Sequence, residues 1–331
     1  MSSNMISDNI LNSFLGKTAV VTGGTGLIGR QIVDILVDAG STVKVVSLDQ
    51  NKVNNKAEHV IGDLSDFGFC KQITKDVDFV FHIAGVKGSI KVTKEKPASF
   101  FVPLLMMNTN ILEASRINKV KKLVYTSSIG AYCSAEVFIE GENENGPPMD
   151  EFPGLAKRVA EQQILAYKIQ YGLNNFAVVR LSNCFGEGDN FDPENAMVIP
   201  TLMQRIYNKE DPVVIWGDGS AIRDFAYSRD VAEGIVLAIH YGTGSKYINL
   251  GSGKGYTIKE LVETFHSFID FNYVFDNSKP SGFPKRIMRI DLAQSVLGYN
   301  PTTTLETGLK KTWQWFINNP NDYLNKKNYF R

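Results

Sequence analysis

Hydrophobic and polar positions follow two rhythms along the first half of the chain. Short runs rich in valine, isoleucine and phenylalanine are apolar on both faces and predict buried strands. These runs occupy residues 18–23, 42–48, 57–63, 77–85, 121–128 and 175–183. Longer segments, in which apolar residues recur every three to four positions, predict helices at residues 27–40, 97–118 and 154–172.

Strands that alternate with crossover helices predict an α/β fold of the Rossmann type, with a doubly wound parallel sheet. After about residue 185 this rhythm loosens: residues 189–200 resemble a loop, and threonines begin helices at residues 257–269 and 303–317. We therefore expect a nucleotide-binding domain at residues 1–185, which a short amphipathic N-terminal helix extends. Residues 186–331 are predicted to form mostly a smaller mixed α/β lobe for the substrate, with some segments returning to the sheet. In such sheets, ligands bind at the carboxyl ends of the strands.

Composition narrows the functional classes. The 331 residues are 43% hydrophobic, and 35 basic residues balance 35 acidic ones, so no excess charge favours nucleic acid or an anionic membrane. The three cysteines lack metal-ligand spacing, so no metal site is expected. Because no apolar run reaches the roughly 18 residues of a membrane span, and the N-terminus lacks a signal-peptide pattern, we expect a cytoplasmic protein.

The first predicted strand leads into a glycine-rich turn, VVTGGTGLIGR. Gly23 permits the tight turn, Gly26 allows the backbone to approach a pyrophosphate, and Gly29 allows helix and strand to pack closely. The helix then presents free N–H groups and the positive end of its dipole to the phosphates. This pattern predicts a dinucleotide site that includes Leu27 and Ile28.

The segment after the second strand indicates which dinucleotide is bound. Asp49 is placed to bond the adenosine ribose hydroxyls, although it comes slightly late, with Ser47 at the usual position. These residues favour NAD, whereas Arg30 could hold a 2′-phosphate and keeps NADP open. Asp63 suits a contact with the adenine edge or, alternatively, a helix cap. Three further residues complete the predicted cofactor set: Leu64, Ala84 and Lys157.

Several blocks in the same order resemble the extended short-chain dehydrogenase/reductase family of nucleotide-sugar enzymes, in particular its GDP-L-fucose-synthase-like branch. The blocks are HIAGVKGSI, LLMMNTNILEAS, NCFGEGDNFDPENAMVIPTL and WGDGSAIRDFAYSRDVA, and the resemblance covers nearly the whole chain. It implies that Asn183, Val198, Arg223 and Arg286 bind a nucleotide sugar. The guanidinium fork of arginine suits the diphosphate of such a substrate.

The resemblance also assigns catalytic positions. In YTSSIGAY, Ser128 matches the family's catalytic hydroxyl, and Lys157 matches the lysine that bonds the nicotinamide ribose. The family's catalytic tyrosine, however, corresponds to Pro153, which a helix tolerates in its first turn. The cysteine and histidine that serve epimerisation in this branch correspond to Gly130 and Met197, neither of which can transfer a proton.

The site therefore combines a cofactor, a serine, a lysine and a phosphate clamp without the usual acid–base groups. We expect a slow NAD-dependent oxidation of a GDP-linked sugar at C4 to the 4-keto sugar. The resemblance favours GDP-manno-heptose in bacterial capsular polysaccharide biosynthesis. The proton could leave through Lys157, Ser128 or water. Tyr125, Tyr132 and Cys133 are close to Ser128 in sequence and are further candidates to accept it.

Two alternatives remain open at this stage. One is a GDP-4-keto-sugar reductase or epimerase, and the other is a non-catalytic protein that binds NAD(H). The helical segments at residues 97–118 and 154–172 have broad apolar faces, and the family pairs such helices between subunits. We therefore expect a homodimer or homotetramer that binds no nucleic acid and no membrane.

Overall fold

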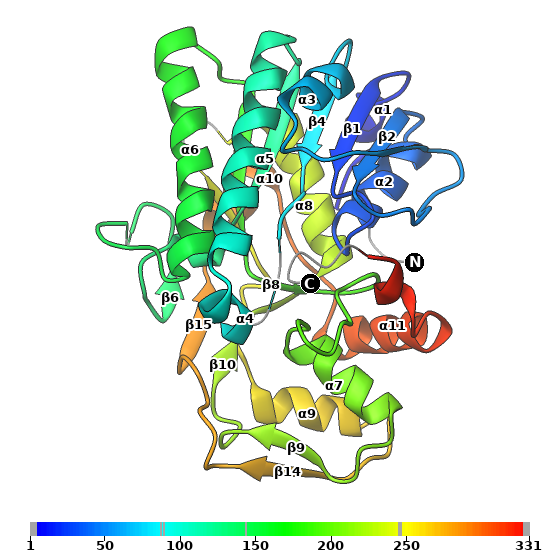
Figure 1. Cartoon of the computed structure of the whole chain (residues 1–331), viewed down its shortest axis with the longest axis vertical. Helices are drawn as coiled ribbons and strands as arrows, with labels where there is room; N and C mark the ends of the chain where they lie inside the picture. The colour runs from blue at the N-terminus through cyan, green and yellow to red at the C-terminus, as the bar shows by residue number, and fades with distance from the viewer. Residues whose placement is uncertain (1–4, 87, 89, 143, 244–246, 327–331) are drawn as a thin grey trace.

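A parallel sheet of seven strands forms the centre of the part of the chain that the structure describes, residues 5–86, 88, 90–142, 144–243 and 247–326 (Figure 1). The structure is a computed structural model. Its strand order is β12-β7-β5-β4-β1-β2-β3. The strands are β1 (Thr18–Thr22), β2 (Thr42–Ser47), β3 (Glu58–Ile61), β4 (Phe79–His82), β5 (Lys122–Ser128), β7 (Phe176–Leu181) and β12 (Ile248–Leu250). The predicted doubly wound parallel sheet is confirmed.

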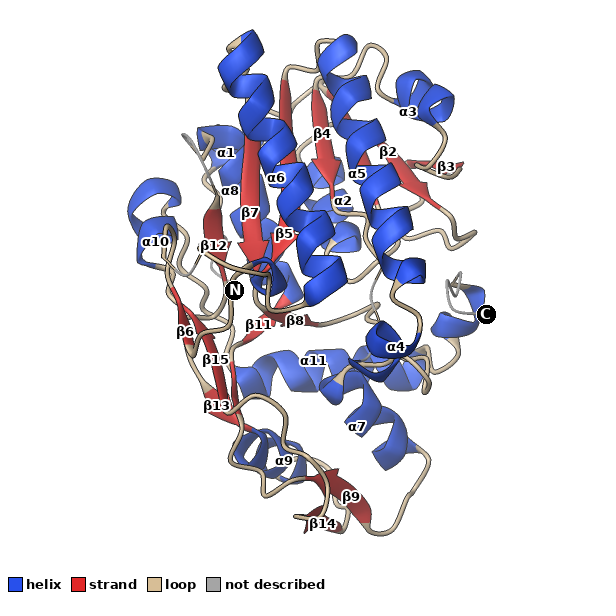
Figure 2. Ribbon diagram, turned by 60° about the vertical axis from the view of Figure 1, so that its left-hand side comes forward, coloured by secondary structure: helices blue, strands red, loops and turns tan. Residues whose placement is uncertain are grey.

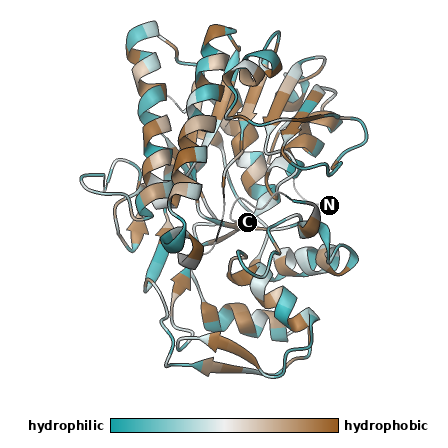
Figure 3. Ribbon diagram, viewed as in Figure 1, coloured by the Kyte–Doolittle hydropathy of each residue, from teal (hydrophilic) through white to brown (hydrophobic). Residues whose placement is uncertain are grey.

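Two helical layers cover this sheet, and Figure 2 shows the strands between them. On one face lie α3 (Phe67–Ile73), α5 (Ala98–Ile117) and α6 (Glu151–Tyr171), which share a hydrophobic core with the strands. On the other face lie α1 (Asp8–Asn12), α2 (Gly29–Asp38), α8 (Ser228–Tyr241) and α10 (Asp291–Leu297). Figure 3 shows hydrophobic positions along the central strands, as expected for strands buried on both faces.

A smaller lobe lies beyond the carboxyl ends of the strands. It contains a four-stranded sheet with the order β13-β10-β15-β6. Two further sheets have two parallel strands each, β11-β8 and β14-β9. Its strands are β6 (Val137–Phe138), β8 (Asn183–Phe185), β9 (Val213–Trp216), β10 (Ile222–Arg223), β11 (Phe225–Tyr227), β13 (Tyr256–Thr257), β14 (Tyr273–Asp276) and β15 (Lys285–Met288). Its helices are α7 (Val198–Tyr207), α9 (Ile258–His266) and α11 (Leu305–Asn318). The short helix α4 (Ile90–Glu95) precedes α5.

Two helices begin earlier than the helical pattern alone indicated, and each has a proline in its first turn, as the sequence allowed for Pro153. Helix α6 begins at Glu151, three residues before the predicted start, and α7 begins at Val198, inside the segment predicted to be a loop. Each helix carries a proline at its third position, Pro153 or Pro200. A proline in the first turn lacks only an N–H that would have no partner inside the helix, so it does not delay the helix start.

The N-terminal segment packs onto the sheet domain. Within α1 and just after it, the side chains of Ile10 and Phe14 are buried in the core beside α2 and α8. The backbone N–H of Met5 donates a hydrogen bond of 2.9 Å to Glu233 in α8. The first four residues of the predicted N-terminal helix lie outside the described residues, as do Lys87 and Ser89 of the HIAGVKGSI block. No helix within the described residues combines the length and apolar character that a membrane crossing requires.

A buried ion pair joins the sheet to α6. Arg180 on β7 is 2% exposed and donates two hydrogen bonds to Glu161, at 2.9 and 2.6 Å. Its guanidinium also lies 3.5 Å from the ring centre of Tyr247. Such a pair contributes modestly to stability while intact, but removal of Glu161 leaves the buried charge of Arg180 with only the more exposed Glu144, 3.2 Å away, as an anionic partner.

We therefore expect Glu161→Ala to lower the free energy of unfolding by about 3–5 kcal/mol. Urea denaturation followed by circular dichroism measures this change. Glu306→Ala, which breaks the exposed pair between Lys310 and Glu306 on α11, serves as the control and should cost less than about 1 kcal/mol. Equal effects of the two substitutions would show that the buried pair does not hold α6 to the sheet.

Candidate functional site

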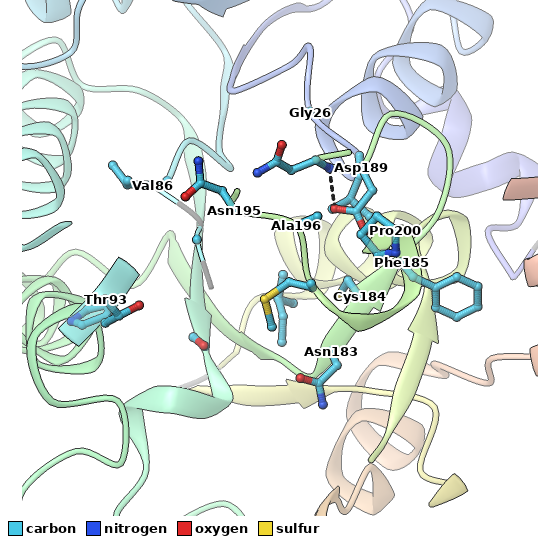
Figure 4. Close-up of a pocket in the computed structure, with 18 of the residues that line it drawn as sticks. Gly26, Val86, Thr93, Asn183, Cys184, Phe185, Asp189, Asn195, Ala196 and Pro200 are labelled. Carbon is cyan, nitrogen blue, oxygen red and sulfur yellow. Dashed lines mark hydrogen bonds between the residues drawn. The ribbon is translucent and has the colours of Figure 1, made fainter. Parts of the chain in front are cut away.

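One cleft contains the residues that the sequence assigned to catalysis, to the cofactor and to the substrate, with the exception of Arg30. It has a volume of about 1710 Å³ and lies between the carboxyl ends of the central strands and the lobe. Figure 4 shows Gly26 of the glycine-rich turn and Asn183 and Pro200 of the lobe around it. The predicted residues that line it are Gly23, Gly26, Leu27, Ile28, Asp49, Asp63, Leu64, Ala84, Ser128, Lys157, Asn183, Val198, Arg223 and Arg286.

The glycine-rich turn has the form that a dinucleotide requires. Gly23 has a φ of +67°, and a Cβ on it would lie 2.8 Å from the Cα atom of Ala84. A Cβ on Gly29 would lie 2.2 Å from the carbonyl oxygen of Gly23. A Cβ on Gly26 would approach only that same carbonyl oxygen, at 3.3 Å, so the open side of Gly26 faces the cleft. These residues fit a pyrophosphate at the start of α2.

The acidic residue after β2 is held in place by its neighbours. Asp49 accepts a hydrogen bond of 2.9 Å from the hydroxyl of Thr25, and Ser47 donates to the Asp49 carbonyl oxygen at 2.9 Å. Arg30, in contrast, does not line the cleft. It donates to the Thr25 carbonyl oxygen at 3.0 Å and lies 4.9 Å from the ring centre of Trp315. The carboxylate therefore faces the cleft, and the arginine turns toward the C-terminal part of the chain.

Asp63 is not the helix cap that the sequence left open as an alternative. Its carboxylate accepts a hydrogen bond from the backbone N–H of Ser65 at 2.9 Å, whereas Asp66 caps α3 by accepting from Phe69. The two aspartates are three residues apart, and only the local turn decides which one reaches a free N–H group of the helix. Asp63 remains at the edge of the cleft.

Ser128 and Lys157 approach the cleft from β5 and α6. Ser128 ends its strand, and its hydroxyl oxygen accepts a hydrogen bond of 3.1 Å from the N–H of Gly130, which leaves its own hydrogen available to a ligand. The Lys157 ammonium group donates to the Thr126 carbonyl oxygen at 2.7 Å. Burial lowers the pKa of Lys157 to about 8, although Glu161 partly opposes this shift.

Three side chains that are close in sequence do not reach the cleft. Tyr125 and Tyr132 are fully buried, and their hydroxyl groups bond Asn108 and Asn249. Burial raises the pKa of each tyrosine above its usual value. The thiol of Cys133 accepts a hydrogen bond from Arg158 and also does not line the cleft. These three residues were therefore wrong as candidate proton acceptors.

A carboxylate that the sequence analysis missed occupies the space beside Gly130. Asp150 immediately precedes α6 and lines the cleft together with Pro153. A Cβ on Gly130 would lie 2.2 Å from an Asp150 carboxylate oxygen. Burial raises the pKa of Asp150, although Arg286 partly opposes this shift. No sequence motif identifies Asp150. Two features together could have indicated it: it immediately precedes a helix, and Gly130 stands where the family has a larger side chain.

Two arginines lie side by side at the lobe end of the cleft. Arg223 on β10 is the register partner of Arg286 on β15. Burial, followed by the charge of Arg286, lowers the pKa of Arg223 to about 10. Burial also lowers the pKa of Arg286, whose Nε is buried without a hydrogen-bond partner among the described residues. Adjacent buried cations are unfavourable alone, so this arrangement suits a bound polyanion such as a diphosphate.

A buried aspartate, Asp224, holds the backbone of the strands that carry these arginines. Asp224 is 0% exposed, and its carboxylate accepts hydrogen bonds from the N–H groups of Ser252 (2.8 Å) and Met288 (3.3 Å). Its backbone N–H donates to the Arg286 carbonyl oxygen at 3.0 Å. Its carbonyl oxygen accepts from the side chain of Asn183 at 3.3 Å. One residue thus ties β8, β10 and β15 together at the cleft.

The C-terminal part of the chain also contributes to the cleft, which the sequence did not indicate. Tyr323, Leu324 and Lys326 line it. The Lys326 ammonium group donates to the carbonyl oxygens of Gly188 (2.8 Å) and Asp189 (3.2 Å). Because these bonds join segments more than 130 positions apart, no local pattern could have revealed them.

Comparison with known proteins agrees with this geometry. The model of the NAD dependent epimerase/dehydratase family matches residues 19–251. The chain is 32% identical to a putative GDP-L-fucose synthase 2 from Arabidopsis thaliana, over 96% of this chain and 98% of that protein. It resembles the structure of UDP-glucose 4-epimerase with UDP-glucose from Thermotoga maritima, with a TM-score of 0.81 and 29% identity over 91% and 99% of the two chains. It also resembles a GDP-L-fucose synthetase from Naegleria fowleri bound to NADP, with a TM-score of 0.77 and 26% identity over 92% and 94%.

The glycine turn yields a paired prediction. Gly26→Ala should weaken NADH binding at least about tenfold while the protein stays folded, because its methyl group enters the space of the pyrophosphate. Gly29→Ala should instead destabilise the fold by about 1–3 kcal/mol, because its methyl group overlaps backbone atoms. NADH fluorescence titration and thermal melting measure the two effects. Wild-type affinity in Gly26→Ala would contradict the proposed position of the pyrophosphate.

Proposed function

The chain belongs to the NAD dependent epimerase/dehydratase family, and from that membership we propose that it oxidises a GDP-linked sugar at C4, using NAD. One observation carries this proposal. A single cleft joins the glycine-rich turn, the pair Ser128 and Lys157, and the two lobe arginines, whereas Pro153 stands where the family has its tyrosine. The parts needed to hold a cofactor and a nucleotide sugar are present, and the usual proton-transfer groups are not.

The residues of the sheet domain hold the cofactor. The first N–H groups of α2 and the turn around Gly26 bind the pyrophosphate, Asp49 accepts from the adenosine ribose hydroxyls, and Asp63 lies toward the adenine. The Lys157 ammonium group, already hydrogen-bonded to Thr126, bonds the nicotinamide ribose. When bound, the oxidised nicotinamide accepts a hydride from the substrate.

The residues of the lobe hold the substrate. Arg223 and Arg286 neutralise the diphosphate, and Asn183 and Val198 border the sugar nucleotide. Guanine is favoured as the base because the DNF and WGDG blocks resemble those of GDP-sugar enzymes, and because relatives include GDP-L-fucose synthases. Ser128 donates its hydroxyl hydrogen to the sugar oxygen and so fixes which carbon faces the cofactor.

The missing groups argue for oxidation or reduction without epimerisation. Inversion beside a ketone needs an acid and a base on either side of the ring, and the family positions for these groups hold Gly130 and Met197. GDP-manno-heptose is the substrate that we favour, as a step of capsular polysaccharide biosynthesis. A GDP-4-keto-sugar reductase is the second candidate. It uses the same residues in reverse, and the relatives named as GDP-L-fucose synthases favour it.

The choice of NAD rests on Asp49 and Arg30. A carboxylate near the adenosine ribose repels a 2′-phosphate, and Arg30 is buried against Trp315, outside the cleft lining. The related synthetase from Naegleria fowleri is bound to NADP, so NADP remains the competing cofactor.

An oligomer and a cytoplasmic location complete the proposal. The large apolar side chains that helices α5 and α6 expose include Val102, Met106, Leu155 and Val159, each 40–49% exposed. Such a pair of helix faces supports a four-helix contact between two copies of the chain.

The main test mixes the purified protein and NAD with GDP-manno-heptose, and separately NADH with a GDP-4-keto sugar, while absorbance at the NADH band is followed. We expect NADH to form in the first mixture, and Ser128→Ala to slow its formation about 10²-fold with unchanged NADH binding. Faster oxidation of NADH in the second mixture would favour the reductase. No redox change with any nucleotide sugar would favour a non-catalytic NAD(H)-binding protein.

Cofactor choice has its own test. Wild-type protein should bind NADH at least about tenfold more tightly than NADPH, and Asp49→Ser should narrow or remove this difference because it removes the repelling charge. Titration of the cofactor fluorescence measures both affinities. Asp34→Ser, on the adjacent helix α2 and outside the cleft lining, is the control and should leave the ratio unchanged. A wild-type preference for NADPH would overturn the choice of NAD.

A further inference from the structure

The family's acid–base side chains are absent at Gly130 and Pro153, and the carboxylate of Asp150 lies beside Gly130. The proposed function gives this carboxylate no role. Asp150 fills the position that a side chain on Gly130 would take, since a Cβ there would lie 2.2 Å from its Oδ2 atom. Its side chain is 41% exposed, and the residue lines the cleft. One side of the carboxylate therefore rests on the Gly130 backbone, and the other side is open to a ligand.

The backbone around Asp150 is fastened on both sides. Its N–H donates to the Gly130 carbonyl oxygen at 3.1 Å, and its own carbonyl oxygen accepts from Gly154 at 2.5 Å. A Cβ on Gly154 would lie 2.2 Å from the Gly130 carbonyl oxygen, so only glycine permits this approach. The start of α6 is thereby locked against the segment 129–131, and the position of the Asp150 carboxylate follows from it.

Gly130 connects this carboxylate to Ser128. The Gly130 N–H donates to the Ser128 hydroxyl, and the Gly130 carbonyl oxygen accepts from the Asp150 N–H. The hydroxyl and the carboxylate therefore flank one residue and face the same cleft. Glu151 also lines the cleft, but of the two carboxylates only that of Asp150 lies against Gly130.

We propose that Asp150 is the catalytic base of this site and takes the proton that the absent tyrosine would otherwise receive. The inference rests on the proposed oxidation. The O–H bond of the sugar hydroxyl breaks and its proton binds an Asp150 carboxylate oxygen, while the electron pair of that bond forms the second bond of the carbonyl group. The C–H bond on the same carbon breaks, and its hydrogen leaves with both electrons to the oxidised nicotinamide dinucleotide. Asp150 then returns the proton to water.

The charges around Asp150 are compatible with this role. Arg286 on β15 lies 3.8 Å away, which is too far for a direct hydrogen bond, and a bound diphosphate would draw on the same guanidinium. The segment Ile129–Ala131 carries no charged side chain of its own. On α6 the nearest charged residues along the chain are the exposed Glu151, then Lys157, and then Arg158, which donates a hydrogen bond to the Ala131 carbonyl oxygen. The 41% exposed side chain is only partly desolvated, and this partial burial raises the pKa of Asp150 toward the working pH of a base.

Asp150→Asn provides the test, with Glu151→Gln as the matched control on the adjacent residue. In the wild type, kcat/KM should rise with pH and level off as Asp150 loses its proton. Asp150→Asn should lower the plateau by about 10²- to 10⁴-fold and remove this rise, with unchanged affinities for NADH and GDP. Glu151→Gln should keep the wild-type profile. Gly130→Ala, whose methyl group displaces the carboxylate without removing it, should lose activity as Asp150→Asn does.

A second readout does not depend on turnover. A carboxyl group whose pKa is raised by folding destabilises the protein above its unfolded pKa of about 4, and this penalty disappears as pH falls through that value. Asp150→Asn should therefore melt at a higher temperature than the wild type at pH 7, with a difference that vanishes near pH 4. A structural ion pair with Arg286 would produce a lower melting temperature at pH 7 instead.

The outcomes separate the two proposals. Activity of Asp150→Asn within about threefold of the wild type, with the rise in the pH profile retained, overturns the role of Asp150 and leaves the oxidation standing. A lower melting temperature of Asp150→Asn at pH 7 also overturns that role. A wild type that binds NADH and GDP but oxidises no nucleotide sugar rejects the proposed function, and the role of Asp150 falls with it.

Discussion

The buried carboxylate of Asp224 holds the cleft together. It lies where the last residues of the sheet domain meet the lobe, and it accepts hydrogen bonds from Ser252 and Met288 while its backbone bonds Asn183 and Arg286. A carboxylate without exposure to water is tolerated only when several donors surround it, and here those donors come from separate segments. The positions of the side chains proposed to bind the substrate therefore depend on one satisfied polar centre and not on the surrounding loops.

Three cations that line the cleft are only partly compensated by neighbouring protein groups. Burial lowers the pKa values of Lys157, Arg223 and Arg286, so each charge has lost hydration without full replacement by protein partners. A dinucleotide and a sugar nucleotide each bring a diphosphate that can supply the missing negative charge. These buried charges therefore lower the stability of the fold at the proposed site, a distribution common in enzymes.

The buried tyrosines show why nearness in sequence is a poor guide to proton transfer. Tyr125 and Tyr132 flank Ser128 in the chain, yet β5 and the segment after it direct both side chains into the core. There they bond Asn108 and Asn249, and Tyr132 also lies 4.2 Å from the Arg180 guanidinium. Asp150, 22 positions beyond Ser128, does line the cleft, because glycines at 130 and 154 allow its backbone to lie against the segment after β5.

The sequence alone determined the doubly wound sheet, six of its seven strands and the glycine-rich turn, because strand burial and the turn after β1 are local patterns of residue type and spacing. The short edge strand β12 was not predicted. It also made Ser128, Lys157, Arg223 and Arg286 candidates for the site, through ordered blocks that resemble a known family, and all four line one cleft. Three contacts follow from the tertiary structure alone. Asp150 fills the space beside Gly130, Asp224 accepts a hydrogen bond from Met288 of the lobe, and Lys326 donates one to the Gly188 carbonyl oxygen. These contacts join residues that are far apart in the chain, and side-chain packing, which no local pattern encodes, sets their geometry.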